Sequence, residues 1–154
     1  MRILVISDSH GNTRNIERAV ESQPEANIII HLGDGADDIV DLEFVYRDKQ
    51  FYQVAGNCDW GSSLPLEGEL KVADKTIFFV HGHEYKVKTN LQQIKLEARK
   101  RNADIVLFGH THLPITEYDD ELYLLNPGSL QYADGTYGII DITDACISVQ
   151  IRKV

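Results

Sequence analysis

The sequence predicts an α/β fold of two sheets packed face to face, with helices on the outside. Two observations lead to this fold class. In the first half of the chain, short apolar runs alternate with segments of helical periodicity, which implies parallel strands joined by right-handed crossovers. In the second half, short strands follow one another between turn residues. With 154 residues and neither a repeat nor a linker, the chain is expected to form one domain, residues 1–154.

Buried strands are predicted where a short apolar run is bounded by polar or turn residues. Such runs cover residues 2–7, 27–32, 51–56 and 104–109. The sequence ELKVADKTIFFVHG predicts a hairpin that turns at Asp74-Lys75, because apolar and polar residues alternate on both sides. Turn signals then separate four further strands, ITEY, LYLL, TYGIID and CISVQIRK, the first turn being Asp119-Asp120.

Three segments have the spacing of helices. Residues 12–23 place Ile16, Ala19 and Val20 on one face, with Asn12 or Thr13 as the cap. Residues 36–46 form a second helix on Ile39, Val40 and Phe44, and residues 86–101 a third that turns Leu91, Ile94 and Ala98 inward.

Composition excludes several classes of function. The chain has 24 acidic and 15 basic residues and a formal charge of −9, so it repels extended nucleic acid. Its basic stretch, residues 95–101, contains Glu97 and fits a solvated helix face. The apolar run at the N-terminus is too short for a signal peptide or membrane span, and Cys58 and Cys146 form no CxxC pair. We therefore expect a cytoplasmic protein without a membrane partner.

Polar residues able to bind metal follow five of the predicted strands. In an open α/β sheet, the loops beyond the carboxyl ends of the strands line the ligand crevice. Seven side chains are therefore expected to converge at one edge, namely Asp8, His10, Asp34, Asn57, His81, His110 and His112. Imidazole and carboxylate together suit Mn, Fe, Zn or Ni. Seven ligands are too many for one catalytic metal, and they fit two metals that share a carboxylate.

Each of these residues also has an ordinary structural interpretation. A histidine after an apolar run is often a hydrogen-bonded core residue, which we favour for His31 and leave open for His83. The sequence DSH could be a turn with a helix cap, HTH a polar strand edge, and Asn57 a turn residue after Gly56. Ligand-type residues follow five separate strands, and chance does not readily explain this coincidence. The metal site is therefore the favoured interpretation.

The ordered motifs DSH, GD, GNCD, HGH, GHTH and NPGS, between residues 8 and 129, resemble those of the calcineurin-like metallophosphoesterase superfamily. The nearest resemblance is to its small, single-domain bacterial and archaeal phosphodiesterases. It implies a four-layer α/β/β/α sandwich of two mixed sheets. It also implies a metal-dependent phosphoesterase, most simply a phosphodiesterase, in which a metal-bridging hydroxide attacks a phosphate ester at a dinuclear centre.

By the same resemblance, Asp8, His10, Asp34 and His112 would hold one ion. Asp34, Asn57, His81 and His110 would hold the other, with Asp34 bridging. Two Mn²⁺ ions are expected, with Zn²⁺, Fe²⁺ or Ni²⁺ as alternatives. The expected partner is a small phosphate-ester substrate, and a homo-oligomer is left open.

One position departs from the family pattern. Many larger members carry a histidine directly after Gly-Asn, where it protonates the leaving group, and here that position is Cys58. His83 is the one nearby candidate for the missing acid. Asn57 and Trp60 are candidates for binding substrate, although Trp60 could instead pack on a neighbour or a partner subunit.

The alternative function is a protein-binding scaffold on the same fold with weak or no catalysis, as in the retromer subunit that this fold resembles. A scaffold can lose metal ligands, whereas this chain has all seven. The complete set favours catalysis.

Overall fold

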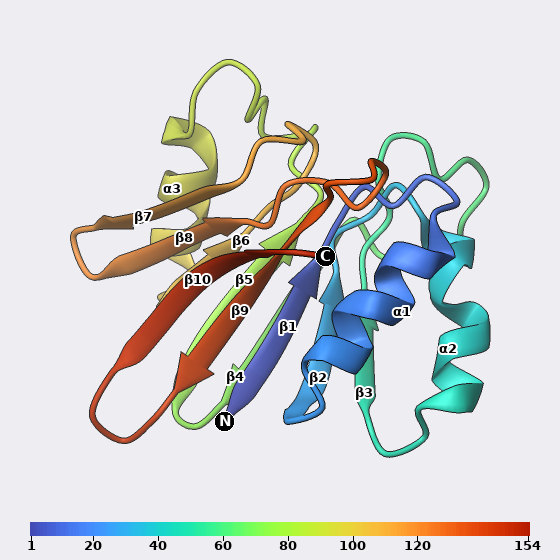
Figure 1. Cartoon of the computed structure of the whole chain (residues 1–154). Coiled ribbons are helices and arrows are strands. Elements are labelled where there is room, and N and C mark those ends of the chain that lie inside the picture. The colour runs from blue at the N-terminus through green and yellow to red at the C-terminus, as the bar shows by residue number, and fades with distance from the viewer.

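The computed structural model describes residues 1–154 and has the predicted fold class, two mixed five-stranded sheets with helices outside (Figure 1). The first sheet contains β1 (Arg2–Ile6), β2 (Ala26–His31), β3 (Gln50–Gln53), β9 (Thr136–Ile142) and β10 (Ile147–Lys153), in the order β10-β9-β1-β2-β3. The second contains β4 (Glu67–Val72), β5 (Lys75–Val80), β6 (Ile105–Leu107), β7 (Ile115–Asp119) and β8 (Leu122–Asn126), in the order β4-β5-β6-β8-β7. As predicted, β1, β2 and β3 are parallel.

Apolar side chains form three cores that set these layers. The largest lies between the sheets, where Val5, Ile30 and Leu107 are fully buried. A second lies beneath α1 (Thr13–Ser22), the short 3₁₀ helix η1 (Ala36–Ile39) and α2 (Val40–Val45). A third lies beneath α3 (Gln92–Lys100), on the far side of the second sheet. Figure 1 shows α1 and α2 on one side of the molecule and α3 on the other.

The helix predicted over residues 12–23 is confirmed, with Asn12 as its cap, because the Asn12 side chain accepts a hydrogen bond from the Asn15 amide. The helix predicted over residues 86–101 is wrong in its first turn and a half. Turns occupy residues 83–89, and Lys86 has a positive φ of 53°, which a helix does not allow. Val87 lies in these turns and its side chain is buried. It continues the apolar spacing of the helix, although it does not belong to α3.

The predicted turns are each displaced by one residue. The β4–β5 hairpin turns at Ala73-Asp74 instead of Asp74-Lys75, because these two residues adopt the positive φ that a tight hairpin requires. The β7–β8 hairpin likewise turns at Asp120-Glu121 instead of Asp119-Asp120. The segment predicted as a helix over residues 36–46 is divided into η1 and α2.

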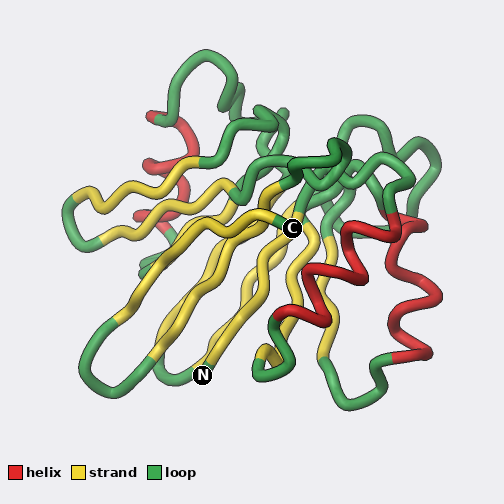
Figure 2. Tube along the Cα trace, viewed as in Figure 1, coloured by secondary structure: helices red, strands yellow, loops and turns green.

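The loops after β1, β2, β3, β5 and β6 gather at one end of the molecule, as the green segments at the top of Figure 2 show. These loops carry the polar residues picked out in the sequence. The opposite end carries the β4–β5 and β9–β10 hairpin turns. None of the helices combines the length and apolar character needed to cross a lipid bilayer.

Candidate metal centre

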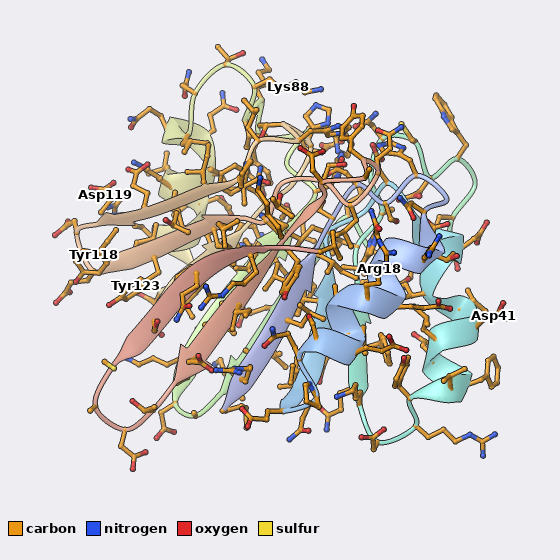
Figure 3. All side chains as sticks on the ribbon, viewed as in Figure 1. Arg18, Asp41, Lys88, Tyr118, Asp119 and Tyr123 are labelled. Carbon is orange, nitrogen blue, oxygen red and sulfur yellow. The ribbon has the colours of Figure 1, made fainter.

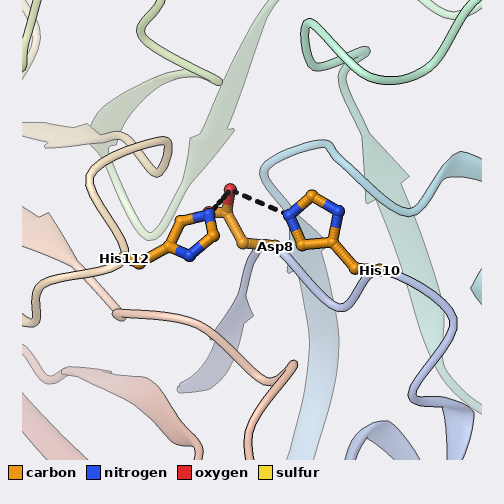
Figure 4. A group of neighbouring side chains, drawn as sticks. All are labelled: Asp8, His10 and His112. Atoms are coloured by element: carbon orange, nitrogen blue, oxygen red, sulfur yellow. Dashed lines mark ion pairs between the residues drawn. The ribbon is translucent and has the colours of Figure 1, made fainter.

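The seven predicted side chains come together in two overlapping groups at the loop-rich end. Asp8, His10 and His112 form the first group (Figure 4). The Oδ1 atom of Asp8 lies 3.1 Å from Nε2 of His112 and 4.0 Å from Nε2 of His10. One carboxylate oxygen and two ring nitrogens therefore face the same small volume.

The second group is built around His81. Its Nε2 atom lies 3.0 Å from Oδ1 of Asn57 and 3.1 Å from Nδ1 of His110. Its other nitrogen, Nδ1, lies 2.8 Å from the carbonyl oxygen of Leu32, which can only accept a hydrogen bond. Nδ1 therefore donates this hydrogen bond, and Nε2 is the nitrogen that faces the other two side chains.

Asp34 lies between the two groups. Its Oδ2 atom is 3.8 Å from Nε2 of His10 and 3.6 Å from Nε2 of His81. Its Oδ1 atom accepts a hydrogen bond of 2.7 Å from the Cys58 amide, which fixes the orientation of the carboxylate.

The residues present fit divalent cations. Asp8 and Asp34 are 0% and 3% exposed and form no ion pair with Lys or Arg, so their buried negative charge lacks a protein counter-charge. Oδ1 of Asp8 accepts no hydrogen bond, although Nε2 of His112 lies 3.1 Å away. Bound cations would satisfy both the charge and this oxygen.

The pKa of His110 is lowered to about 4, first by burial and then by the neighbouring His81 and Lys88. Lys88 lies on the loop between β5 and α3, at the end of the molecule where the loops gather (Figure 3). His110 is therefore neutral at pH 7, the protonation state in which an imidazole binds metal.

Five of the seven side chains lie on left-handed backbone, with φ between 46° and 66°, namely Asp8, His10, Asp34, His110 and His112. This region costs a non-glycine residue about 1 kcal/mol or more. Neighbouring glycines allow the close approach that this arrangement needs. A Cβ atom at Gly56 would lie 2.1 Å from Oδ1 of Asp34.

The loops are held by side chains that sequence reasoning did not identify. Asp59 accepts four backbone hydrogen bonds of 2.7–2.9 Å, from the amides of Asp34, Gly35, Ala36 and Gly56. Burial alone would raise the pKa of Asp59, but these four donors outweigh it and hold the pKa below its ordinary value. Asp59 thus ties the loop after β2 to the loop after β3. No local pattern signals this role, because the donors lie in two separate segments.

Two further residues hold the loop after β1 and the segment that follows β8. Asp38 accepts hydrogen bonds from Oγ of Ser9 and from the Gly11 amide. Ser129 donates to the carbonyl oxygen of Asp8 over 2.8 Å and is itself buried. Ser129 therefore supports the loop after β1 from beneath the site.

His31 has the ordinary structural role that the sequence favoured. It is fully buried, its Nδ1 accepts from the Gly33 amide, and its Nε2 lies 3.1 Å from Oγ of Ser9. Burial lowers its pKa to about 4, so it is a neutral core residue.

The remaining candidates at the edge of the centre are His83, Cys58 and Trp60. His83 packs its ring 5.4 Å from that of His81, and its buried Nδ1 has no hydrogen-bond partner. Burial raises the pKa of the Cys58 thiol, and the Asp34 carboxylate raises it further. Trp60 is 91% exposed and does not pack on the body of the chain.

A protein-family comparison matches residues 1–145 to the calcineurin-like phosphoesterase superfamily domain. The chain is 32% identical over 133 residues to the probable metallophosphoesterase YsnB of Bacillus subtilis, covering 85% of this chain and 76% of that protein. It is 28% identical over 160 residues to phosphodiesterase MJ0936 of Methanocaldococcus jannaschii, covering 92% of this chain and 93% of that one.

Solved structures agree on the fold. A predicted phosphoesterase from Streptococcus pneumoniae matches with a TM-score of 0.84 and 25% identity, covering 99% of this chain and 88% of that one. Wild-type Vps29 from Entamoeba histolytica, complexed with Zn²⁺, matches with a TM-score of 0.78 and 21% identity, covering 100% and 98%. The chain belongs to the calcineurin-like phosphoesterase superfamily, a family of metal-dependent phosphoric ester hydrolases.

Proposed function

We propose that this chain is a phosphodiesterase that works with two divalent cations. The observation that carries the proposal is the position of Asp34, a buried carboxylate between two groups of ligand-type side chains. Asp8, His10, Asp34 and His112 would hold one ion. Asp34, Asn57, His81 and His110 would hold the other. Mn²⁺ is the proposed metal, with Zn²⁺, Fe²⁺ and Ni²⁺ as alternatives, because the donor set mixes oxygen and imidazole nitrogen.

The side chains prepare the centre for hydrolysis of a phosphate ester. When bound, two divalent cations supply Lewis acidity at the phosphate and an activated water molecule. The hydrogen bond from His81 to Leu32 and that from the Cys58 amide to Asp34 fix the orientation of two proposed ligands. The raised pKa of Cys58 keeps its thiol protonated, which argues against a cysteine nucleophile.

Preference for diesters over monoesters is supported by relatives named phosphodiesterases, MJ0936 and YfcE of Escherichia coli, the latter 26% identical over 169 residues. We further propose that the chain acts as one domain, in the cytoplasm, on a small phosphate ester. A net charge of −9 disfavours extended nucleic acid.

The test is hydrolysis of bis(p-nitrophenyl) phosphate and p-nitrophenyl phosphate before and after removal of metal by a chelator. We expect activity to disappear with the chelator, to return with Mn²⁺, and to be higher on the diester. Elemental analysis should give two metal ions per chain. Asp34→Asn should lose activity and one or both ions, whereas Asp37→Asn, the same change at an exposed position three residues away, should lose neither. Chelator-insensitive activity would contradict the proposal.

A protein-binding scaffold is the second candidate, since Vps29 shares this fold. The intact set of seven side chains favours the enzyme. A protein that binds two metal ions but hydrolyses neither ester with any of the four metals would support the scaffold.

A further inference from the structure

Tyr132 is an exposed aromatic side chain at the edge of the candidate metal centre. It is 55% exposed, and its ring meets that of His112 edge to face, with 6.3 Å between the ring centroids. The rings of His112 and His10 are in turn 5.4 Å apart. The rings of His10, His112 and Tyr132 thus lie in a row, and Tyr132 is the member that reaches into solvent.

The backbone beneath Tyr132 is held firmly. The side chain of Asn15, which is buried on α1, donates to the carbonyl oxygens of Leu130 and Tyr132 over 2.8 Å and 2.7 Å. Asn12 donates to the carbonyl oxygen of Gln131 over 3.0 Å. This segment is joined to the loop after β1, since Ser129 donates to the Asp8 carbonyl. The ring therefore has a fixed base beside the metal centre and needs little further ordering to bind a ligand.

The other large exposed aromatic side chains do not share this position. Phe44, Trp60 and Tyr118 are more exposed, and none of them contacts a histidine of the centre. Tyr118 instead packs on Tyr123, and Figure 3 shows both at the left edge of the molecule, on β7 and β8. The exposed ring of Tyr132 has one aromatic neighbour, and that neighbour is a candidate metal ligand, His112. Tyr132 is therefore placed to contact the organic group of a bound ester.

We infer that Tyr132 selects the substrate, by stacking on an aromatic group carried by the phosphate ester on the His112 side of the centre. The substrate class is thus a phosphodiester with an aryl group or a nucleobase. This inference rests on the function proposed above. Tyr132 is a specificity residue and takes no part in bond cleavage, so its ring matters and its hydroxyl does not.

The test measures ligand binding to the metal-loaded protein by calorimetry. It uses two pairs of ligands, and within each pair one member carries an aromatic group and the other does not. The first pair is phenyl methylphosphonate and cyclohexyl methylphosphonate, which have the same charge and similar size. The second is adenosine 5′-methylphosphonate and ribose 5-methylphosphonate. The protein variants are Tyr132→Leu and Tyr132→Phe, with Tyr118→Leu as the control at a distant exposed tyrosine.

We expect the wild type to bind the aromatic member of at least one pair about fivefold more tightly or better, the lower range of stacking on an aromatic side chain. Tyr132→Leu should abolish that preference, while Tyr132→Phe and Tyr118→Leu keep it. The pair that responds identifies the aromatic group as aryl or nucleobase.

Equal binding within both pairs by the wild type, or a preference that survives Tyr132→Leu, would overturn the inference. A variant that weakens aromatic and non-aromatic ligands equally would also overturn it, because that result indicates a structural role. These outcomes are distinct from failure of the proposed function, in which the wild type shows no metal-dependent hydrolysis of either p-nitrophenyl ester.

Discussion

Replacing Asp59 with alanine is expected to weaken both the fold and the metal centre. The side chain accepts four backbone hydrogen bonds and joins the loop that carries Asp34 to the loop that carries Asn57. At about 1 kcal/mol net for each bond, and with water able to reach a half-buried position, the loss is about 2–4 kcal/mol of unfolding free energy. For a chain of 154 residues, that corresponds to a fall of roughly 4–16 °C in the thermal midpoint.

Metal affinity should fall as well, by about 10- to 100-fold, the range for residues that orient metal ligands. Asp59→Asn should recover little, because its amide nitrogen would face two backbone N–H donors in place of an oxygen. Thermal unfolding of the metal-free protein and calorimetric titration with Mn²⁺ measure the two effects. Asp48→Ala, the same change at an exposed aspartate, serves as the control. If Asp59→Ala matched that control in both measurements, the four hydrogen bonds would not hold the loops as argued.

Three further predictions follow from the site and the first sheet. Asp8→Asn or His110→Ala should abolish turnover and leave the thermal midpoint of the metal-free protein within a few degrees; unfolding of the variants would instead indicate a structural role. Across diesters with one retained group, the rate should depend steeply on leaving-group pKa, because position 58 holds no histidine. If the rate of the wild type did not depend on leaving-group pKa, and the rate of His83→Ala depended on it steeply, His83 would be the acid. The hydrogen-bonded Arg2 lowers the pKa of Asp141, so their pair stabilises the fold above about pH 4 and ceases to do so as pH falls through the lowered pKa. Urea midpoints of the wild type and Asp141→Asn should therefore differ at pH 7 and converge once the pH has fallen through the lowered pKa of Asp141.

The convergence of the seven side chains was predictable because it depends on simple rules. Parallel strands direct their carboxyl ends to one edge, so Asp8 and Asp34, after β1 and β2, had to meet. The apolar runs also fixed which segments are buried, and the two-sheet architecture followed from them.

Other features depend on long-range contacts that a local pattern does not carry. The donors to Asp59 come partly from residues 34–36, more than twenty positions earlier. The helix predicted over residues 86–101 was too long because residues 83–89 form turns held by backbone hydrogen bonds, and the apolar spacing of Leu91, Ile94 and Ala98 does not show where α3 begins. Tyr132 has no motif of its own, and its place beside His112 results from hydrogen bonds to α1.

The left-handed backbone of five of the proposed ligands bears on how such a protein evolves. Glycine or asparagine would occupy the same conformation at lower cost, so retaining these residues would require selection for the proposed reaction. A gene copy released from catalysis would therefore gain stability from many of the same substitutions that destroy the centre. For this chain, stability would then favour the change from hydrolase to binding protein, and the return would require several strained residues to reappear together.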